Sequence, residues 1–206
     1  MDILASTIGY FANAPFWELV AVGLSIAYVI LVAHNSIWCW PAALISTFIF
    51  TVIFYDVSLL MESLLNGYYM VMAVYGWYCW QRSSQVNHGE KIIRWPLRHH
   101  LVLVLALSLL SLLLGWYMAN YTQADFAYLD TFTTVFAMAT TYLVAIKVFE
   151  NWWYWIVINT ASVYLYLQKG LEPTACLAMF NIVMCFIGIY RWHSAYKLQL
   201  APGNGS

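Results

Sequence analysis

The chain has 206 residues, of which 64% are hydrophobic and only 8% are charged, with a mean hydropathy of +0.72. A soluble domain carries roughly 25% charged residues, so this composition excludes an ordinary soluble globular protein. The formal net charge is −1, which gives no global field for binding nucleic acid. The four cysteines lie in or beside apolar runs without metal or disulfide spacing, and we interpret them as packing residues.

Seven apolar runs follow one another along the chain, and a run of about 20 residues is enough to cross the hydrocarbon core of a bilayer. Because lipid offers no partner for unpaired backbone groups, we predict that each run is a transmembrane helix. The runs cover residues 16–33, 37–54, 57–80, 100–119, 127–148, 151–168 and 171–193. The first run matches the later ones in length, so we interpret it as a mature helix and not as a signal peptide. The sequence therefore predicts an all-α, multi-pass membrane protein.

Lysine and arginine gather on one side of the predicted bundle. That side holds all but one of them: Arg82, Lys91, Arg94, Arg98, Lys147, Arg191 and Lys197. Because basic loops face the cytoplasm, we expect the N-terminus outside and the C-terminus in the cytoplasm. The polar ending 199–206 carries no span signal, and we interpret it as a disordered tail or a cloning remnant.

The two halves of the chain resemble each other when residues 16–80 are aligned with 131–195, at an offset of 115 in the numbering. The matches include several polar and aromatic pairs: Trp38/Trp153, Trp40/Trp155, Asn66/Asn181, Tyr75/Tyr190 and Trp77/Trp192. The hydropathy peaks also superpose. We therefore expect two parallel three-helix repeats, 1–80 and 127–198, joined by a basic loop and linker helix at 81–126. Parallel repeats of this kind occur in transporters, which bind substrate between the halves near mid-membrane.

Polar and aromatic side chains within the predicted spans are the candidate binding residues. An amide at mid-bilayer needs a neighbouring helix, water or a ligand as its partner. Asn66 lies on one stripe of the third span together with Glu62 and Tyr69, at 100° per residue. We predict substrate contacts from polar groups and stacking rings: Asn66, Asn181, Asn159, Thr47, Tyr69 and Glu62, with Trp77, Trp192, Trp155 and Trp40.

Each of these residues also has a structural interpretation. The asparagines would then be interhelical contacts worth about 0.6 kcal/mol each, and the tryptophans would belong to the interfacial aromatic belt. Glu62 could attract a cation, carry a proton or form a structural pair. An aromatic cavity with amides and one carboxylate suits a flat, polar heterocycle with positive charge.

Other classes of protein find less support in the sequence. It lacks the H-E-x-x-H motif, the nucleophile elbow, the phosphate-binding glycine loop and a Cys/His metal cluster, so we expect neither an enzyme nor a cofactor. A retinal protein would need a lysine inside the seventh run to form the Schiff base, and residues 171–193 contain none. The sequence therefore does not favour a retinal protein. A membrane receptor or assembly subunit without transport stays open as an alternative, in which the asparagines only hold helices together.

Three stretches of the sequence resemble the PnuC-type vitamin and nucleoside transporters: WCWPAALIST (38–47), YGWYCW (75–80) and ENWWYWIVINTASVYLYLQKG (150–170). The resemblance covers both three-helix halves, and the linker helix matches in position only. It implies a bacterial inner-membrane carrier with a SWEET-like 3+1+3 fold and a homotrimeric assembly. It also implies nicotinamide riboside as substrate, moved by facilitated diffusion with alternating access and trapped through phosphorylation by a cytoplasmic nucleoside kinase.

The chain departs from the pattern of this family at several polar positions. Many members have Asp and Gln in place of Glu62 and Asn66, often Asn in place of Thr47, and frequently Asp in place of Asn159. These changes keep polarity but alter reach and charge. Thiamine or another vitamin or nucleoside therefore stays an alternative substrate for the same fold.

Overall fold

The computed structural model describes residues 9, 14–56, 60–86, 91–122 and 126–200 of the chain. Within these ranges it contains seven helices: α2 (Phe16–Ala33), α3 (Cys39–Asp56), α4 (Leu60–Val86), α5 (Leu97–Tyr121), α6 (Ala127–Ala145), α7 (Asn151–Gln168) and α8 (Glu172–Leu200). They confirm the seven predicted helices. Helices α4 and α8 continue for several residues past the predicted apolar runs, since polar turns extend both helices beyond them. The first two residues of the predicted tail belong to α8, and the rest of it lies outside the described residues.

Four of these helices, α2, α3, α5 and α8, are long and apolar enough to cross a membrane by length and composition. Within the described residues, helices α4, α6 and α7 are not apolar enough to meet the same criterion. Their sequences are richer in tyrosine, threonine and asparagine, as in NWWYWIVINTASVYLYLQ of α7. Many residues of α6 are buried against other helices, including three of its threonines, so much of this polarity faces protein.

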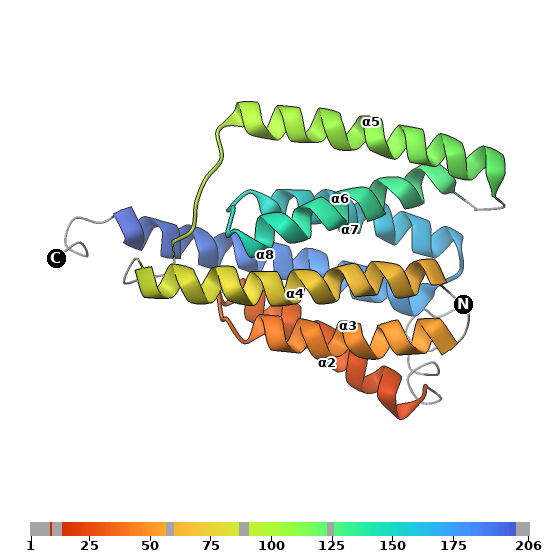
Figure 1. The fold of residues 1–206 in the computed structure, drawn as a ribbon, viewed down its shortest axis with the longest axis horizontal. Helices are drawn as coiled ribbons and strands as arrows, with labels where there is room; N and C mark the ends of the chain where they lie inside the picture. Colours follow the sequence, from red (N-terminus) through yellow and green to blue (C-terminus); the bar gives the residue numbers. More distant parts are fainter. Residues whose placement is uncertain (1–8, 10–13, 57–59, 87–90, 123–125, 201–206) are drawn as a thin grey trace.

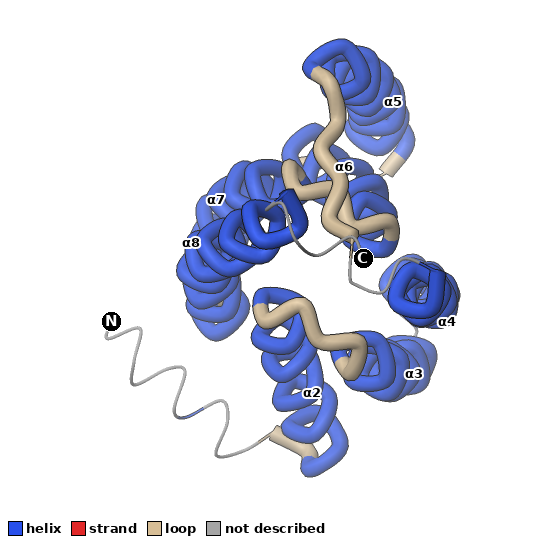
Figure 2. The backbone as a smooth tube through the Cα atoms, turned by 90° about the vertical axis from the view of Figure 1, so that its left-hand side faces the viewer, coloured by secondary structure: helices blue, strands red, loops and turns tan. Residues whose placement is uncertain are grey.

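The helices form two groups of three, with α5 standing apart. Within each group, helices that are neighbours in sequence pack on each other: α2 on α3 and α3 on α4, then α6 on α7 and α7 on α8. The groups meet along two seams, α4 against α6 and α2 against α8, which the end-on view displays (Figure 2). Helix α5 lies along the outer side of α6 (Figure 1).

Helix α5 approaches α6 closely at one glycine. A Cβ atom at Gly115 would stand 2.7 Å from Cδ1 of Tyr128, so only glycine leaves room for this contact. Many other side chains of α5 are apolar and exposed, as lipid requires: Leu101, Val102, Leu105, Leu109, Leu112 and Leu113. Helix α5 is therefore an appendage of the second group.

Four tryptophans, Trp40, Trp80, Trp152 and Trp192, form the centre of the core and are almost inaccessible to solvent. We call them the tryptophan cluster. Trp40 meets Trp80 edge-on with ring centroids 5.5 Å apart, and Trp152 meets Trp192 edge-on at 5.4 Å. The interplanar angle is 89° in both pairs. The rings of Trp80 and Trp192, with centroids 6.1 Å apart, join the two pairs between the two groups of helices.

The tryptophan cluster also ties the two groups together by hydrogen bonds. Trp80 of α4 donates from Nε1 to the carbonyl of Val144 in α6, at 3.2 Å. Trp192 of α8 donates from Nε1 to the carbonyl of Val32 in α2, at 2.9 Å. Each seam therefore contains a buried hydrogen bond from a tryptophan N–H to a valine carbonyl, and the two bonds join equivalent residues of the two groups.

The residues that form these two hydrogen bonds are separated by 112 in the numbering between the first group and the second. Val32 and Val144 are related by this offset, and so are Trp80 and Trp192. It also relates the turn residues Asn35 and Lys147, whose φ angles of 56° and 55° lie in the left-handed region. The predicted offset of 115 is therefore wrong by three residues. Three residues are close to one helical turn. An alignment of the two halves that is shifted by three residues therefore still pairs residues on the same face of each helix, which are often of similar type.

The segment before α5 is fastened to the turn between α6 and α7. Ile93 and Val148 form an isolated β-bridge. The Ile93 N–H donates to the carbonyl of Lys147 at 3.0 Å, and the Phe149 N–H donates to the carbonyl of Ile93 at 2.8 Å. The linker is thus held to the second group at both ends of α6: by this bridge at one end, and near the other by the Gly115 contact.

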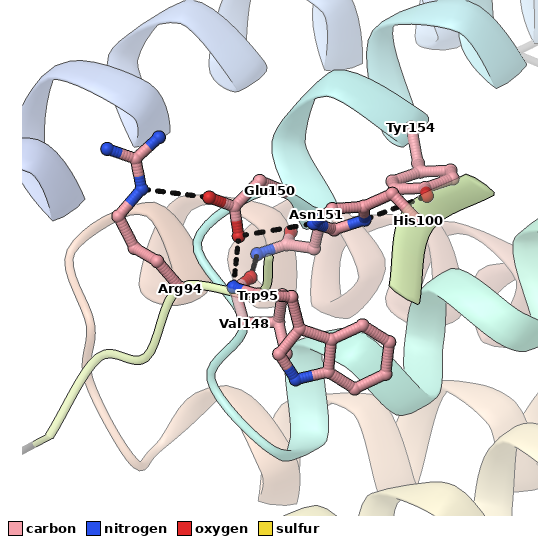
Figure 3. A network of polar contacts seen from close by, with 7 residues as sticks. All are labelled: Arg94, Trp95, His100, Val148, Glu150, Asn151 and Tyr154. Atoms are coloured by element: carbon pink, nitrogen blue, oxygen red, sulfur yellow. Dashed lines mark hydrogen bonds and ion pairs between the residues drawn. The ribbon is translucent and has the colours of Figure 1, made fainter. Parts of the chain in front are cut away.

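A polar network around Glu150 completes this attachment (Figure 3). The Glu150 carboxylate accepts hydrogen bonds from Nε of Arg94 at 2.8 Å and from the backbone N–H of Trp95 at 3.2 Å. Nε2 of His100 lies 3.7 Å from the same carboxylate. Nδ1 of His100 lies 3.0 Å from the Tyr154 hydroxyl. Glu150 therefore connects the start of α5 to the start of α7.

We expect Glu150→Ala to lower the free energy of unfolding by about 1–3 kcal/mol, the cost of leaving the part-buried Trp95 N–H and the largely buried His100 without their partner. The Glu150 side chain is only 14% exposed, so water cannot fully replace it. Asp56→Ala, an exposed carboxylate at the end of α3, is the matched control. Thermal unfolding of both variants in a mild detergent tests the prediction, and equal melting temperatures would contradict it.

Candidate functional site

Two cavities lie inside the bundle, between the two groups of helices. Hydroxyl-bearing and aromatic side chains are prominent in the lining of the first, which measures about 210 Å³: Tyr28, Trp40, Ser46, Thr47, Tyr69, Thr141 and Trp155. The second measures about 160 Å³, and its lining includes two asparagines and two tryptophans: Tyr28, Val144, Trp152, Trp155, Asn159 and Asn181. The first cavity is lined from α2, α3, α4, α6 and α7, and the second from α2, α6, α7 and α8. Because Tyr28 and Trp155 line both cavities, we treat them as one central chamber.

The first side of the chamber offers hydroxyl groups. Ser46 donates from Oγ to the carbonyl of Ala21 at 2.8 Å, and Thr47 donates from Oγ1 to the carbonyl of Ala43 at 2.8 Å. A hydroxyl that has donated its hydrogen keeps lone pairs for accepting a bond. This side can therefore accept hydrogen bonds from a polar ligand.

The second side offers amides. Asn159 donates from Nδ2 to the carbonyl of Trp155 at 2.8 Å, and Asn181 donates from Nδ2 to Oδ1 of Asn159 at a long 3.5 Å. Each Nδ2 carries a second hydrogen. Among the described residues, Oδ1 of Asn181 has no hydrogen-bond partner. The pair can therefore both donate to and accept from a ligand amide.

The two sides of the chamber correspond to each other at the offset of 112. Thr47 corresponds to Asn159, and Tyr69 corresponds to Asn181. Trp40 corresponds in the same way to Trp152. Two of these matched places carry hydroxyls on one side and amides on the other, so the chamber can distinguish the two ends of a ligand.

Six of the ten predicted site residues line this chamber: Trp40, Thr47, Tyr69, Trp155, Asn159 and Asn181. Asn66 is not among the lining residues of either cavity, and its Nδ2 donates to the carbonyl of Glu62 in its own helix at 2.9 Å. The predicted pairing of Asn66 with Asn181 is therefore wrong. The counterpart of Asn181 is Tyr69, three residues further along α4.

Three other predicted residues also lie outside the chamber. Trp192 is inaccessible and belongs to the tryptophan cluster, where its indole N–H is already used by Val32. Trp77 packs against the exposed Trp38, with ring centroids 6.0 Å apart. Glu62 is exposed, and its charged neighbours are Asp130 and Lys169 near the opposite end of the bundle from the tryptophan cluster.

Sequence reasoning missed two aromatic residues of the chamber. Tyr28 of α2 borders both cavities, and Trp152 lines the second. A signal for Tyr28 exists, because Tyr28 and Ser25 stand three residues apart in an otherwise aliphatic stretch of α2. Trp152 was missed because the offset of 115 matched Trp40 to Trp155 and so gave Trp152 no counterpart among the candidate residues.

The arrangement as a whole is that of a membrane transporter: apolar helices in two groups that enclose a small aromatic and polar chamber between them. The described residues contain no group of three or more His, Cys, Asp or Glu side chains able to hold a metal ion. The rings, hydroxyls and amides that line the chamber are groups suited to contacts with a small polar organic molecule.

Comparison with known proteins agrees with this class. Residues 15–194 match the family described as nicotinamide mononucleotide transporter, and the chain belongs to this family. The nicotinamide riboside transporters PnuC of Escherichia coli (strain K12) and Shigella flexneri are each 27% identical over 171 residues, covering 71% of this chain and 70% of the relative. A crystal structure of the vitamin B3 transporter PnuC shares the fold, with a TM-score of 0.74 over 95% of this chain and 89% of that chain, at 19% identity. The resemblance to PnuC-type transporters is thereby confirmed.

Proposed function

We propose that this protein takes up nicotinamide riboside across the inner membrane of a bacterium. The observation that carries the proposal is the central chamber, where Tyr28 and Trp155 stand between a hydroxyl side and an amide side. The relatives named for nicotinamide riboside transport support the choice of substrate. The chain would thus supply the cell with a precursor for NAD biosynthesis.

The chemistry of the substrate fits the two sides of the chamber. Nicotinamide riboside has a flat pyridinium ring that bears a carboxamide and is joined to a ribose. The positive ring would stack between Tyr28 and Trp155, gaining cation–π attraction. Its carboxamide would face Asn159 and Asn181, which can donate and accept at the same time. The ribose hydroxyls would then reach Thr47 and Tyr69.

Alternating access is the transport mechanism that we propose. The two groups of helices would be parallel repeats related by the offset of 112, with all seven helices crossing the membrane, the N-terminus outside and the basic end in the cytoplasm. Rocking of one group against the other would open one end of the chamber at a time. The bonds from Trp80 to Val144 and from Trp192 to Val32 would hold the cytoplasmic end closed until rocking breaks them.

The transport would be facilitated diffusion, made one-way because a cytoplasmic nucleoside kinase phosphorylates the arriving substrate. We place the first repeat at 1–80, the basic loop and linker helix at 81–126, and the second repeat at 127–198. A homotrimer is the assembly that we propose, with the apolar surface of α5 against lipid or a neighbouring subunit.

Binding is tested by thermal unfolding of the purified protein in a mild detergent with nicotinamide riboside, nicotinamide, thiamine, riboflavin or thymidine. A ligand at a hundredfold excess over its Kd stabilises the folded state by about 2.7 kcal/mol. We expect a shift with nicotinamide riboside, followed by flux into liposomes. A shift with thiamine or another vitamin alone would keep the carrier and change its substrate. No shift with any of them, together with no flux, would favour a receptor or assembly subunit.

Proton coupling through Glu62 is not expected, because this exposed carboxylate is outside the central chamber. Glu62→Gln should therefore leave the rate of nicotinamide riboside entry into liposomes unchanged within about twofold, a difference near 0.4 kcal/mol. Uptake by the unmodified protein should equilibrate without regard to an imposed pH gradient. Accumulation driven by that gradient, and lost in Glu62→Gln, would contradict this expectation.

A further inference from the structure

A third cavity lies at the basic end of the bundle, at the seam between α4 and α6. It measures about 420 Å³, within the range of about 300–1,000 Å³ for pockets that hold small organic molecules. Tyr75, Cys79 and Trp80 of α4 line it from one side, and Ala145 and Ile146 at the end of α6 line it from the other. The ends of α4 and α6 that border this cavity face the viewer in Figure 2. This seam is therefore hollow at the basic end.

The cavity and the central chamber have walls made of adjoining residues. On α6, Val144 lines the chamber and the next residue, Ala145, lines the cavity. Across the seam, Trp40 lines the chamber and Trp80 lines the cavity, and their rings meet edge-on. The hydrogen bond from Nε1 of Trp80 to the carbonyl of Val144 joins these two walls. Trp80 and its hydrogen bond therefore lie between the two spaces.

The matching place at the seam between α2 and α8 is packed. Ser83 lines the cavity, and its counterpart at the offset of 112 is Ala195. Ala195 and the neighbouring Tyr196 pack against the hydrophobic core. Trp192, the counterpart of Trp80, is inaccessible. The two seams therefore differ at this end, although a hydrogen bond from a tryptophan crosses each of them.

From this arrangement we infer that the substrate leaves the central chamber through the seam between α4 and α6, and that the third cavity is the cytoplasmic mouth of its path. The inference rests on the transport function and the membrane orientation proposed above. Separation of Trp80 from Val144 would join the two spaces, because these residues stand in adjoining walls. At the other seam, Ala195 and Tyr196 would obstruct such a path.

Cys79 allows the path to be blocked at a known place, because it lines the cavity and is half-buried. The reagent is a membrane-impermeant maleimide with a polyethylene glycol chain, applied to everted inner-membrane vesicles, which expose the cytoplasmic face. We expect labelling of Cys79 to remove the flux of nicotinamide riboside. Thermal stabilisation of the labelled, purified protein by nicotinamide riboside should persist, since the chamber is untouched. Cys79→Ala should keep its flux in the presence of the reagent.

Arg191→Cys, made in the Cys79→Ala chain, is the matched control. Position 191 is the counterpart of Cys79 at the offset of 112, and Arg191 is exposed on α8, so the same maleimide should label the new thiol. Flux should persist after this labelling, because the label stands at the other seam. Full flux after complete labelling of Cys79, or an equal loss of flux in the two labelled proteins, would overturn the inference.

A second measurement needs no substrate and so separates the path from the proposed function. Ser46→Cys places a thiol in the chamber, and a small cationic methanethiosulfonate added at the cytoplasmic face reports access to that thiol by mass spectrometry. Prior labelling of Cys79 should slow this modification, and prior labelling of Arg191→Cys should not. That result without any binding or flux of nicotinamide riboside would refute the proposed substrate and keep the path. Unslowed modification after labelling of Cys79 would refute the path and leave the proposed function intact.

Discussion

Replacing Gly76 or Gly188 with alanine is expected to destabilise the protein strongly, although each is a single methyl group added to a helix. A Cβ atom at Gly76 would overlap with the six-membered ring of Trp40, and a Cβ atom at Gly188 would overlap with that of Trp152. Both indoles belong to the tryptophan cluster and are almost inaccessible. Neither ring can move aside without disturbing the edge-on contact with its partner tryptophan.

The expected loss in unfolding free energy is about 1–3 kcal/mol per substitution, as for other overpacked cores. Gly67→Ala is the matched control in α4, because nothing lies within 4 Å of a Cβ atom there. Its effect should be small and of either sign, since alanine also favours the helix. Thermal unfolding in detergent measures all three variants. A melting temperature of Gly76→Ala equal to that of Gly67→Ala would contradict the close packing.

A second substitution can separate this clash from other effects of alanine. Trp40→Phe removes the outer part of the ring that Gly76→Ala would meet. The double variant should therefore be more stable than the sum of the two single effects predicts, by about 0.5–3 kcal/mol, the range for residues in contact. Trp152→Phe should act in the same way on Gly188→Ala and leave Gly76→Ala uncorrected.

The helices could be predicted from the sequence because lipid demands them. Long apolar runs have one stable backbone in a bilayer, so the order and approximate bounds of all seven helices followed from composition alone. The exact offset between the halves could not be obtained in that way. Tryptophans are frequent on both sides of a membrane interface, and a shift of three residues matches Trp77 to Trp192 as readily as the structure matches Trp80 to Trp192.

Better signals for the offset were the glycines. Gly76 stands four residues before Trp80, and Gly188 stands four residues before Trp192. Tryptophans occur both in the interfacial aromatic belt and in the packed core, so a match between two tryptophans does not show which role they have. A glycine has no side chain and allows another side chain to approach closely, so a repeated glycine–tryptophan spacing indicates packing. This spacing fixes the offset at 112 and identifies Tyr69, not Asn66, as the counterpart of Asn181.

The chamber could be predicted only in part, for a related physical reason. A polar residue within an apolar helix indicates a buried partner, but it does not show on which side of the helix that partner lies. Asn159 and Asn181 line the chamber, whereas Asn66 does not, although Asn66 and Asn159 both donate to the carbonyl four residues earlier in their own helices. A rotation of one helix by less than half a turn separates these outcomes, and that rotation depends on packing across the seams.

Asn181→Leu is expected to remove binding of nicotinamide riboside while leaving the protein folded. The substitution takes away the amide that lines the chamber, and leucine keeps the branching at Cγ without any polar atom. Loss of a hydrogen bond to a buried ligand amide costs about 1–3 kcal/mol, so the Kd should rise about 5- to 150-fold. Asn159→Leu should be at least as severe, because Asn159 also accepts a hydrogen bond from Asn181.

Asn66→Leu provides the matched control for this prediction. It makes the same chemical change in α4, on a face outside the chamber. The stabilisation by nicotinamide riboside should therefore persist in Asn66→Leu and disappear in Asn181→Leu at one ligand concentration near the original Kd. Equal losses in the two variants would mean that the ligand binds along the exposed face of α4. Full stabilisation in both Asn181→Leu and Asn159→Leu would show that the amides do not contribute to binding. The rings of Tyr28 and Trp155 would then be the groups that bind the ligand.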